Sequence, residues 1–172
     1  LSRSSAASDV YKRQGINGTA GGGGFSLAIT GDIIYSVKSA KFTVAYTNAG
    51  LSPDGSSTFF LPRIVGMKRA KELMLTNRIF SAEEALEMNL IDQVLDDQEQ
   101  LDQAIEKQAE IFMKGPKKAY AGVKKLLNIS FDNGLETQMD IEGIKISENA
   151  ESLDGVEGLK AFSEKRKPNF NE

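Results

Sequence analysis

One stretch decides the fold of this chain: Asn17-Gly18-Thr19-Ala20-Gly21-Gly22-Gly23-Gly24-Phe25-Ser26-Leu27-Ala28. Its four consecutive glycines remove every Cβ from a short piece of backbone, so their N–H groups can approach a ligand closely. The run leads directly into a helix-compatible segment at 25–30. Because the first amides of a helix lack partners and the helix dipole is positive there, such a loop favours a bound anion or a developing oxyanion. Taken alone, the run is more typical of a flexible linker than of a binding site.

The composition is that of an ordinary globular domain, with 40% hydrophobic and 26% charged residues and a net charge of −3. This mildly acidic balance argues against nucleic acid as a partner. Cysteine and histidine are absent, which excludes a disulfide framework, a thiol nucleophile, Ser-His-Asp catalysis and most zinc sites within this stretch. No apolar run reaches about 18 residues, so we expect no membrane partner. The cytoplasm is the predicted location.

The beginning of the chain is unlike native protein sequence. Residues 4–14 read as the in-frame translation of a transposase adapter used to build sequencing libraries. The basic residues there precede no apolar segment, so a secretory signal is not expected. We therefore exclude residues 1–14 from the fold prediction and expect the native chain to begin at Gly15, inside a structural element, with the first part of the domain missing.

Hydrophobic periodicity predicts strands first and a train of helices afterwards. Strands are expected at 32–36 and 41–46, with a turn-rich loop at 50–57. Ser81-Ala82-Glu83-Glu84 is a capping box that begins a helix. The other expected helices are the following: one that begins at residue 58, a second at 67–76, one at 98–113, a segment after Gly115-Pro116 whose core face is Val123, Leu126 and Leu127, and helices at about 134–148 and 156–165. This order predicts an α/β first half with a helical C-terminal extension, and no linker long enough to divide two domains.

Several motifs along the chain agree in order and spacing with those of one family. They are the following: Asn17-Gly18 with Ala20 and the glycines 21–24, Gly31-Asp32-Ile33, Ser39-Ala40-Lys41-Phe42, Gly50-Leu51 with Pro53-Asp54, Leu61-Pro62-Arg63-Ile64-Val65-Gly66, Ala70-Lys71-Glu72-Leu73, Ser81-Ala82-Glu83-Glu84-Ala85, and Glu157-Gly158-Leu159-Lys160-Ala161-Phe162-Ser163-Glu164-Lys165-Arg166-Lys167-Pro168. Together they cover essentially all of residues 15–172. The sequence resembles the crotonase, or enoyl-CoA hydratase/isomerase, superfamily.

This resemblance implies a fold and a set of partners. The fold is a spiral of ββα turns, expected at about 15–95, followed by a helical trimerisation region at about 96–172. The chain would hold roughly the last two thirds of that fold. The substrate is an acyl-CoA thioester, so coenzyme A enters as part of the substrate and no separate cofactor is expected. The assembly is a homotrimer or a dimer of trimers.

The resemblance also implies an oxyanion hole made of two backbone N–H groups, which hold the thioester oxygen while an enolate forms. Backbone donors suit this task because they are rigid and do not titrate. By the motif, one donor is Gly23, and its neighbours Gly22 and Gly24 contact the substrate. The other donor belongs to a motif upstream of Gly15, together with much of the coenzyme A groove.

Hydratases of the family use two glutamates, and the matching positions here are Ser26 and Tyr46. Neither residue can act as a carboxylate acid or base, so a standard two-glutamate hydratase is not expected. Both are candidate substrate-binding residues. Ser26 could donate a hydrogen bond or cap a helix, and Tyr46 could line the acyl pocket or lie in the core or at its rim.

Asp54 is the carboxylate in the region where several isomerases of the family carry their acid/base aspartate. The resemblance is greatest to the isomerase branch that acts on ring-epoxidised phenylacetyl-CoA. One carboxylate suits a double-bond shift, since it removes a proton at one carbon and returns it at another. The local alternative is that Asp54 shapes the Pro-Asp-Gly-Ser turn and caps the following helix.

Three other functions remain open. In the 4-chlorobenzoyl-CoA dehalogenase branch, an aspartate at this position is the nucleophile and an aromatic residue occupies the position of Tyr46. The chain could also be an enoyl-CoA hydratase or a non-catalytic acyl-CoA-binding homologue. Near the C-terminus, Lys165 could meet coenzyme A phosphates or complement the helix dipole. Phe162 and Phe170 could flank adenine or only pack.

Overall fold

The computed structural model describes residues 11–170, which form two compact units. The first consists of residues 12–107, and the second consists of Tyr11 with residues 108–170. The boundary falls inside α4 (Gln98–Met113), between Lys107 and Gln108. The prediction that residues 1–14 derive from a sequencing adapter falls mostly on residues outside the described range. Arg13 and Gln14 are described, and they form the first half of strand β1 (Arg13–Ile16).

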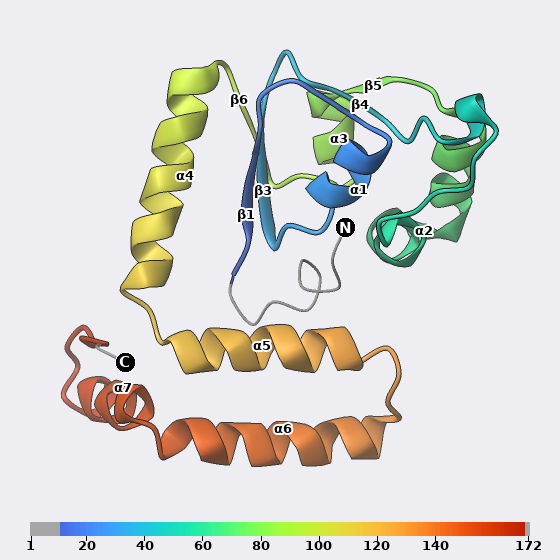
Figure 1. Ribbon diagram of the computed structural model, residues 1–172. Helices are drawn as coiled ribbons and strands as arrows, with labels where there is room; N and C mark the ends of the chain where they lie inside the picture. Colours follow the sequence, from blue (N-terminus) through green and yellow to red (C-terminus); the bar gives the residue numbers. More distant parts are fainter. Residues whose placement is uncertain (1–10, 171–172) are drawn as a thin grey trace. The chain divides into compact units, whose positions relative to one another are not determined.

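The first unit contains two three-stranded sheets (Figure 1). One sheet is fully parallel, in the order β1, β3 (Ile33–Val37) and β6 (Gln93–Leu95). The other has the order β2 (Thr19–Gly21), β4 (Lys41–Thr43) and β5 (Phe80–Ser81), with β2 parallel and β5 antiparallel to β4. Along the chain, β1 and β3 join the first sheet, whereas β2 and β4 join the second. A helical segment follows each pair of strands, after β2 and again after β4. This alternation is the ββα spiral that the family resemblance implies.

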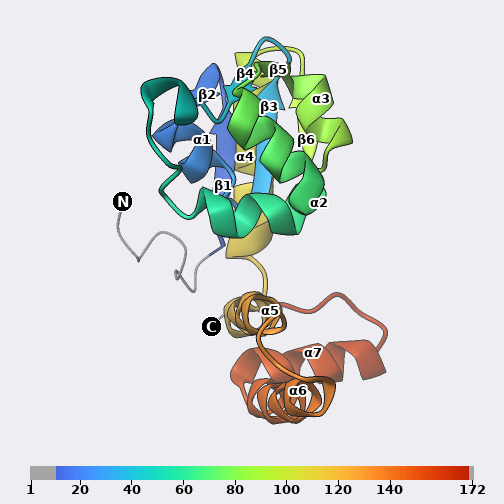
Figure 2. The ribbon, with the colours of Figure 1, turned by 90° about the vertical axis from the view of Figure 1, so that its right-hand side faces the viewer.

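Helical segments alternate with these strands along the chain (Figure 2). Helix α1 (Gly23–Ala28) follows β2 directly, and α2 (Ser57–Thr76) is bent at Gly66, where φ is 78° and ψ is 156°. The bend confirms the two predicted helical segments. The predicted capping box begins α3 (Ala82–Glu87), since the Glu84 amide donates to Ser81 Oγ at 3.2 Å.

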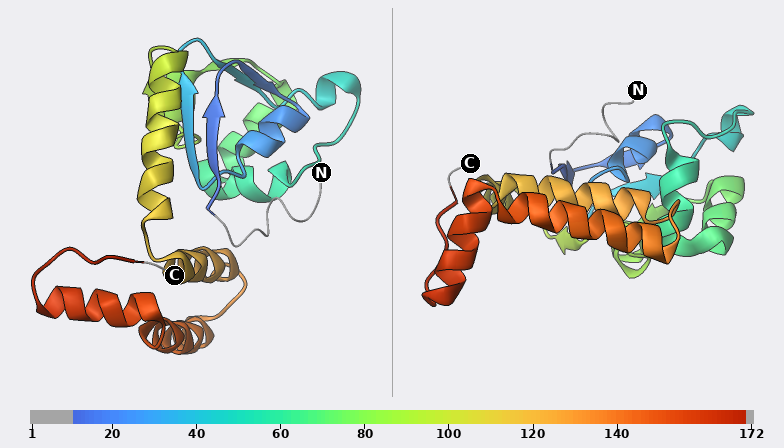
Figure 3. Two further views of the ribbon diagram at one scale, coloured as in Figure 1. Left: turned by 60° about the vertical axis from the view of Figure 1, so that its left-hand side comes forward. Right: turned by 90° about the horizontal axis from the view of Figure 1, so that it is seen from below.

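Aromatic side chains fill the centre of the first unit. The Phe80 ring contacts both the Phe42 ring, with centroids 5.5 Å apart, and the Phe25 ring, with centroids 6.2 Å apart. All three are buried. The N-terminal part of α4 runs beside β1 and β3 (Figure 3), and Leu101 and Ile105 lie 3.5 Å from the place where a Gly15 Cβ would be. The glycine loop and α1 are therefore attached to a packed core.

The second unit is helical. Helices α5 (Lys117–Ile129) and α6 (Leu135–Ala150) form an antiparallel pair, and α7 (Leu153–Ser163) follows α6 (Figures 1 and 3). Helix α7 begins at residue 153 rather than at the predicted 156, because Ser152 Oγ accepts from the Gly155 amide at 3.0 Å and caps it. No helix within residues 11–170 has the length and apolar character needed to cross a membrane.

Two expectations about local structure are wrong. Residues 44–46 do not extend the strand at 41–43, because Ala45 has a positive φ of 59° and turns the chain into a short 3-10 helix, η1 (Thr47–Ala49). Val123 and Leu127 are not core residues of the described chain, since their exposed fractions are 47% and 63%. Periodicity identifies the apolar face of α5 but does not say what covers it.

Candidate functional site

The predicted site residues of the first unit converge although they come from three separate segments. Ser26 lies in α1, Tyr46 immediately precedes η1, and Asp54 lies in the loop before α2. The Ser26 and Tyr46 hydroxyl oxygens are 2.8 Å apart, and Tyr46 Oη donates to Asp54 Oδ1 at 2.6 Å. A Cβ added at Gly23 would lie 4.0 Å from Tyr46 Oη. The glycine loop and one carboxylate therefore meet through two hydroxyl groups.

Gly22 shapes the turn between β2 and α1. Its φ of 54° and ψ of −123° form a conformation that only glycine adopts readily. Its N–H donates to the Thr43 carbonyl at 3.3 Å, and its carbonyl accepts from the Ser26 amide at 3.0 Å. Gly23 and Gly24 are exposed and begin the helix, where amides lack intrahelical partners. A Cβ at Gly22 or Gly24 would contact nothing within 4 Å, so their backbone faces open space.

The loop that carries Tyr46 is fixed by the end of α2. Asn77 ends that helix in the left-handed region, with φ 49°, and its side chain donates to Thr47 Oγ1 and to Asn48 Oδ1. Thr47 Oγ1 in turn donates to the Met74 carbonyl at 3.1 Å. Asn77 is buried, so these bonds are shielded from water. They hold the backbone next to Tyr46 against a packed helix.

The Asp54 side chain does not cap α2. The N-cap residue of that helix is Ser56, which makes no side-chain capping bond. The backbone carbonyl of Asp54 accepts from the Ser57 amide at 3.2 Å and from Ser57 Oγ at 2.9 Å. The carboxylate instead accepts from Tyr46, and Asp54 is exposed. The capping interpretation of this side chain is therefore wrong, and the carboxylate is available at the surface of the site.

The environment of Tyr46 favours its neutral form. Burial raises the pKa of the Tyr46 phenol, and the hydrogen bond to Asp54 raises this pKa further, while the hydrogen bond with Ser26 lowers it. A phenol with a raised pKa keeps its proton at neutral pH. Tyr46 is therefore a hydrogen-bond donor to the carboxylate under ordinary conditions.

The predicted coenzyme A residues near the C-terminus belong to the second unit. Phe162 is 86% exposed, and Lys165 is an exposed residue with a positive φ of 54°. Phe170 packs on α7, since a Cβ at Gly158 would lie 3.6 Å from its ring. Arg166 binds both carboxylate oxygens of Glu157, at 2.6 and 2.9 Å, and lowers the pKa of that carboxyl to about 2. These contacts order the end of α7.

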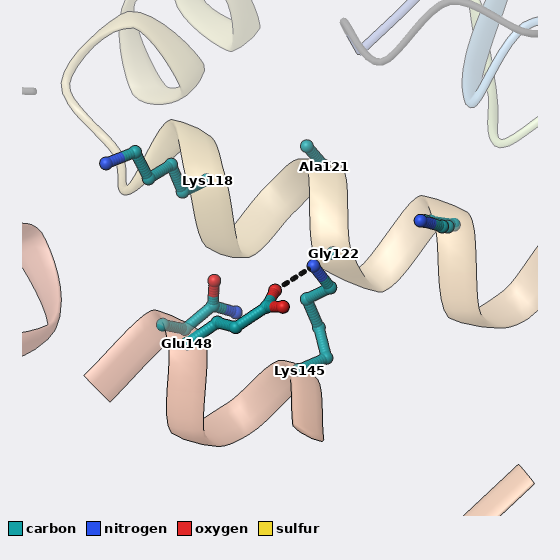
Figure 4. Close-up of a pocket in the computed structure, with 7 residues that line it drawn as sticks. Lys118, Ala121, Gly122, Lys145 and Glu148 are labelled. Atoms are coloured by element: carbon teal, nitrogen blue, oxygen red, sulfur yellow. Dashed lines mark hydrogen bonds and ion pairs between the residues drawn. The ribbon is translucent and has the colours of Figure 1, made fainter. Parts of the chain in front are cut away.

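The second unit also contains a hollow between α5 and α6 with a volume of about 450 Å³ (Figure 4). Three lysines contribute to its lining, and one of them, Lys145, forms an ion pair with Glu148. The lining residues are the following: Lys118, Ala121, Gly122, Lys125, Lys145, Glu148 and Asn149. None of them is among the predicted site residues.

Comparison with known proteins identifies the family of the chain. The family model for enoyl-CoA hydratase/isomerase matches residues 14–172. The chain belongs to the enoyl-CoA hydratase/isomerase family. The match confirms the resemblance to the crotonase superfamily and the α/β fold with C-terminal helices.

Individual members of the enoyl-CoA hydratase/isomerase family are similar over most of the chain. It is 39% identical to the 1,2-epoxyphenylacetyl-CoA isomerase of Escherichia coli and 38% identical to a protein of Rhodobacter capsulatus called a probable enoyl-CoA hydratase. Each comparison covers 90% of this chain but only 59% and 60% of those relatives. The crystal structure of an enoyl-CoA hydratase/isomerase from Cupriavidus metallidurans matches with a TM-score of 0.90 at 31% identity, covering 98% of this chain and 64% of that one. The chain thus spans about three fifths of the length of these relatives.

Two residues that support the site were not predicted from sequence. Asn77 holds the Tyr46 loop, and an asparagine at the end of a helical pattern is a recognisable signal for a left-handed C-cap. Ala45 supplies the turn that aims Tyr46, and no sequence signal predicts it, because alanine disfavours positive φ.

Proposed function

We propose that residues 15–172 are part of an acyl-CoA thioester isomerase with Asp54 as its acid/base and Gly23 as one oxyanion donor. The observation that carries the proposal is the hydrogen bond from Tyr46 to Asp54, which brings a carboxylate next to the glycine loop. Ser26 and Tyr46 stand where the two-glutamate hydratases carry carboxylates. Asp54 is therefore the acid/base available among the predicted site residues, and a single carboxylate suits isomerisation.

The proposed reaction moves a double bond along the acyl chain. Asp54 takes a proton from the carbon next to the thioester carbonyl, and the electron pair of that C–H bond delocalises into the carbonyl and the neighbouring double bond. The Gly23 N–H stabilises the negative charge that develops on the oxygen. Asp54, now protonated, returns a proton to the far carbon of the original double bond. The substrate and product have the same composition, so no co-reactant is consumed.

The second oxyanion donor and most of the coenzyme A site are proposed to come from a longer chain. The similarity to relatives of greater length supports this, since this chain covers about 60% of them. Residues 1–14 are proposed to be adapter-derived, and the protein is proposed to be cytoplasmic. The spiral is proposed to end near residue 95, and the helices that follow are proposed to form the oligomerisation region.

The substrate panel that tests this function uses the protein extended to the length of its relatives. We expect conversion of 3-enoyl and dienoyl CoA thioesters to their double-bond isomers, followed by absorbance at the wavelength of the conjugated thioester. The 172-residue chain alone is expected to be inactive, because half of the oxyanion hole is proposed to lie elsewhere. Chloride release from 4-chlorobenzoyl-CoA would make Asp54 a nucleophile instead. No turnover of any thioester by the extended protein would support a non-catalytic binding protein.

A homotrimer or a dimer of trimers is the proposed assembly. Support comes from large apolar side chains that are exposed in the second unit, where they would cost free energy if they faced water. They include the following: Leu127, Leu135, Met139, Ile144, Ile146, Leu153, Leu159 and Phe162. We expect light scattering coupled to size-exclusion chromatography to give a mass that is a multiple of three chains. A monomeric mass at all concentrations would contradict this assembly.

A further inference from the structure

The hydroxyl of Tyr46 lies between two oxygen atoms and has one proton to donate. Tyr46 Oη is 2.6 Å from Asp54 Oδ1 and 2.8 Å from Ser26 Oγ. An ionised carboxylate only accepts hydrogen bonds, so the phenol proton lies between Tyr46 and Asp54. Tyr46 Oη must then accept from Ser26, whose own proton points towards the phenol. The three side chains form a chain of donors directed from Ser26 to Asp54.

The inner end of this donor chain is fixed by helix α1. Ser26 has an exposed fraction of 0% and lies three residues after Gly23 in the same helix. A buried hydroxyl has few alternative partners and loses free energy when it is unpaired. Because the Ser26 amide is also bonded to the Gly22 carbonyl at 3.0 Å, the hydroxyl is held with the glycine loop. Tyr46 thereby links the position of the carboxylate to the position of the Gly23 amide.

The backbone on both sides of this donor chain adopts conformations that cost free energy. Ala45, next to Tyr46, has a φ of 59°, and Ser56, two residues after Asp54, has a φ of 70°. Non-glycine residues rarely adopt the left-handed region, because their Cβ then crowds the backbone. They persist only where surrounding contacts determine the conformation, and such positions cluster at functional sites. The bonds of Asn77 to Thr47 and Asn48 are contacts of this kind.

We propose that Tyr46 is a positioning residue that holds Oδ1 of Asp54 and leaves Oδ2 to exchange the proton with the substrate, with Ser26 setting the direction of the phenol. Oδ2 has no hydrogen-bond partner among residues 11–170, the part of the chain that is described. The role of Oδ2 rests on the proposed isomerase function. The directed donor chain does not depend on that function and can be measured in the 172-residue protein.

The experiment is an NMR titration of protein carrying tyrosine labelled with ¹³C at Cζ. The chain has four tyrosines, and single Tyr→Phe variants assign their signals. Asp54→Asn should lower the pKa of Tyr46, because it removes the negative charge beside the phenol and leaves only a neutral acceptor. Ser26→Ala should raise the same pKa, because it removes a donor that stabilises the phenolate. Opposite signs for the two variants are the expected result.

Tyr35 provides the matched control. Burial and the nearby Asp92 raise the pKa of Tyr35, so Asp92→Asn should lower that pKa and leave Tyr46 unchanged. An unchanged Tyr35 titration in the Ser26 and Asp54 variants shows that they are folded. If Ser26→Ala lowers the pKa of Tyr46 or leaves it unchanged, Ser26 does not donate and the proposal is overturned. Asp54 is exposed, so the Asp54→Asn measurement stands even if the buried Ser26 variant unfolds, and an unchanged pKa there overturns the proposal too.

A kinetic measurement on the extended protein tests the positioning role. Tyr46→Phe should lower kcat by about 10²-fold, the effect expected when a reacting group is misplaced by about 1 Å. KM should change less than about threefold, since the lost bond is not to the substrate. In an Asp54→Asn background, Tyr46→Phe should have no further effect. Additive losses in the double variant would mean that Tyr46 acts without Asp54 and would overturn the role. Absence of any isomerase activity would refute the proposed function while leaving the titration result in place.

Discussion

Asp54→Asn is expected to reduce isomerase turnover of the extended protein by about 10²–10⁴-fold, the usual contribution of a positioned acid/base. Asparagine has nearly the same shape and its Oδ1 can still accept the Tyr46 hydrogen bond, which is 2.6 Å long in the native site. The variant therefore removes the proton-transfer group and keeps the local geometry. Substrate binding should change little, so the loss should appear in kcat.

The matched control is Asp96→Asn, which replaces an exposed carboxylate elsewhere in the first unit. We expect it to retain full turnover. Steady-state kinetics with a 3-enoyl CoA thioester measure both variants. If Asp54→Asn is as active as Asp96→Asn, Asp54 takes no part in the proton transfer, and the hydrogen bond from Tyr46 would then serve only the loop.

Phe42→Ala is expected to lower the free energy of unfolding by about 3–5 kcal/mol, the range measured for large aromatic truncations in protein cores. Phe42 is only 2% exposed, and its ring stacks on Phe80 at 5.5 Å. Phe80 in turn contacts Phe25 in α1. The truncation therefore leaves a cavity in the aromatic cluster that joins the β2–β4–β5 sheet to α1. The expected loss is a large part of the total stability, because native domains are stable by only about 5–15 kcal/mol.

Phe59→Ala serves as the comparison, because Phe59 is 43% exposed and its ring mainly contacts Phe60 and Arg63. Its loss of stability should be about 1 kcal/mol or less, as for most surface substitutions. The free energy of unfolding of each variant is measured by urea denaturation monitored by circular dichroism. The dependence of this free energy on urea concentration, the m-value, should be the same for the two variants and the unsubstituted protein. Equal losses for the two variants would show that the aromatic cluster is not the core of the first unit.

Local signals in the sequence predicted much of the fold. The Ser81 capping box, the helix at 98–113 and the second helical segment from Met67 depend on residues close together in the sequence, so they could be predicted from local patterns. The residue at which β4 ends could not be predicted in this way. Residues 41–46 alternate as a strand does, but the Ala45 turn depends on contacts with distant segments, such as those from Asn77 to Thr47. Tertiary contacts overrode the local preference.

The candidate site also combines features that the sequence predicted with features that depend on tertiary contacts. The glycine loop and Asp54 were predicted by motif and spacing, while the contact between Ser26, Tyr46 and Asp54 was not. That contact depends on the turn at Ala45, which is not encoded in a recognisable pattern. In α5, the spacing of Val123 and Leu127 likewise identifies an apolar face but not the surface that covers it.

Asp54 is proposed to catalyse isomerisation and not hydration. The most direct test is to let the extended protein act on a 3-enoyl CoA thioester and to determine the products by NMR. Ser26 and Tyr46 provide no second carboxylate to activate water. We therefore predict the 2-enoyl thioester as the end product, with no 3-hydroxyacyl thioester formed at a comparable rate. Accumulation of the 3-hydroxyacyl thioester as the main product would contradict the claim.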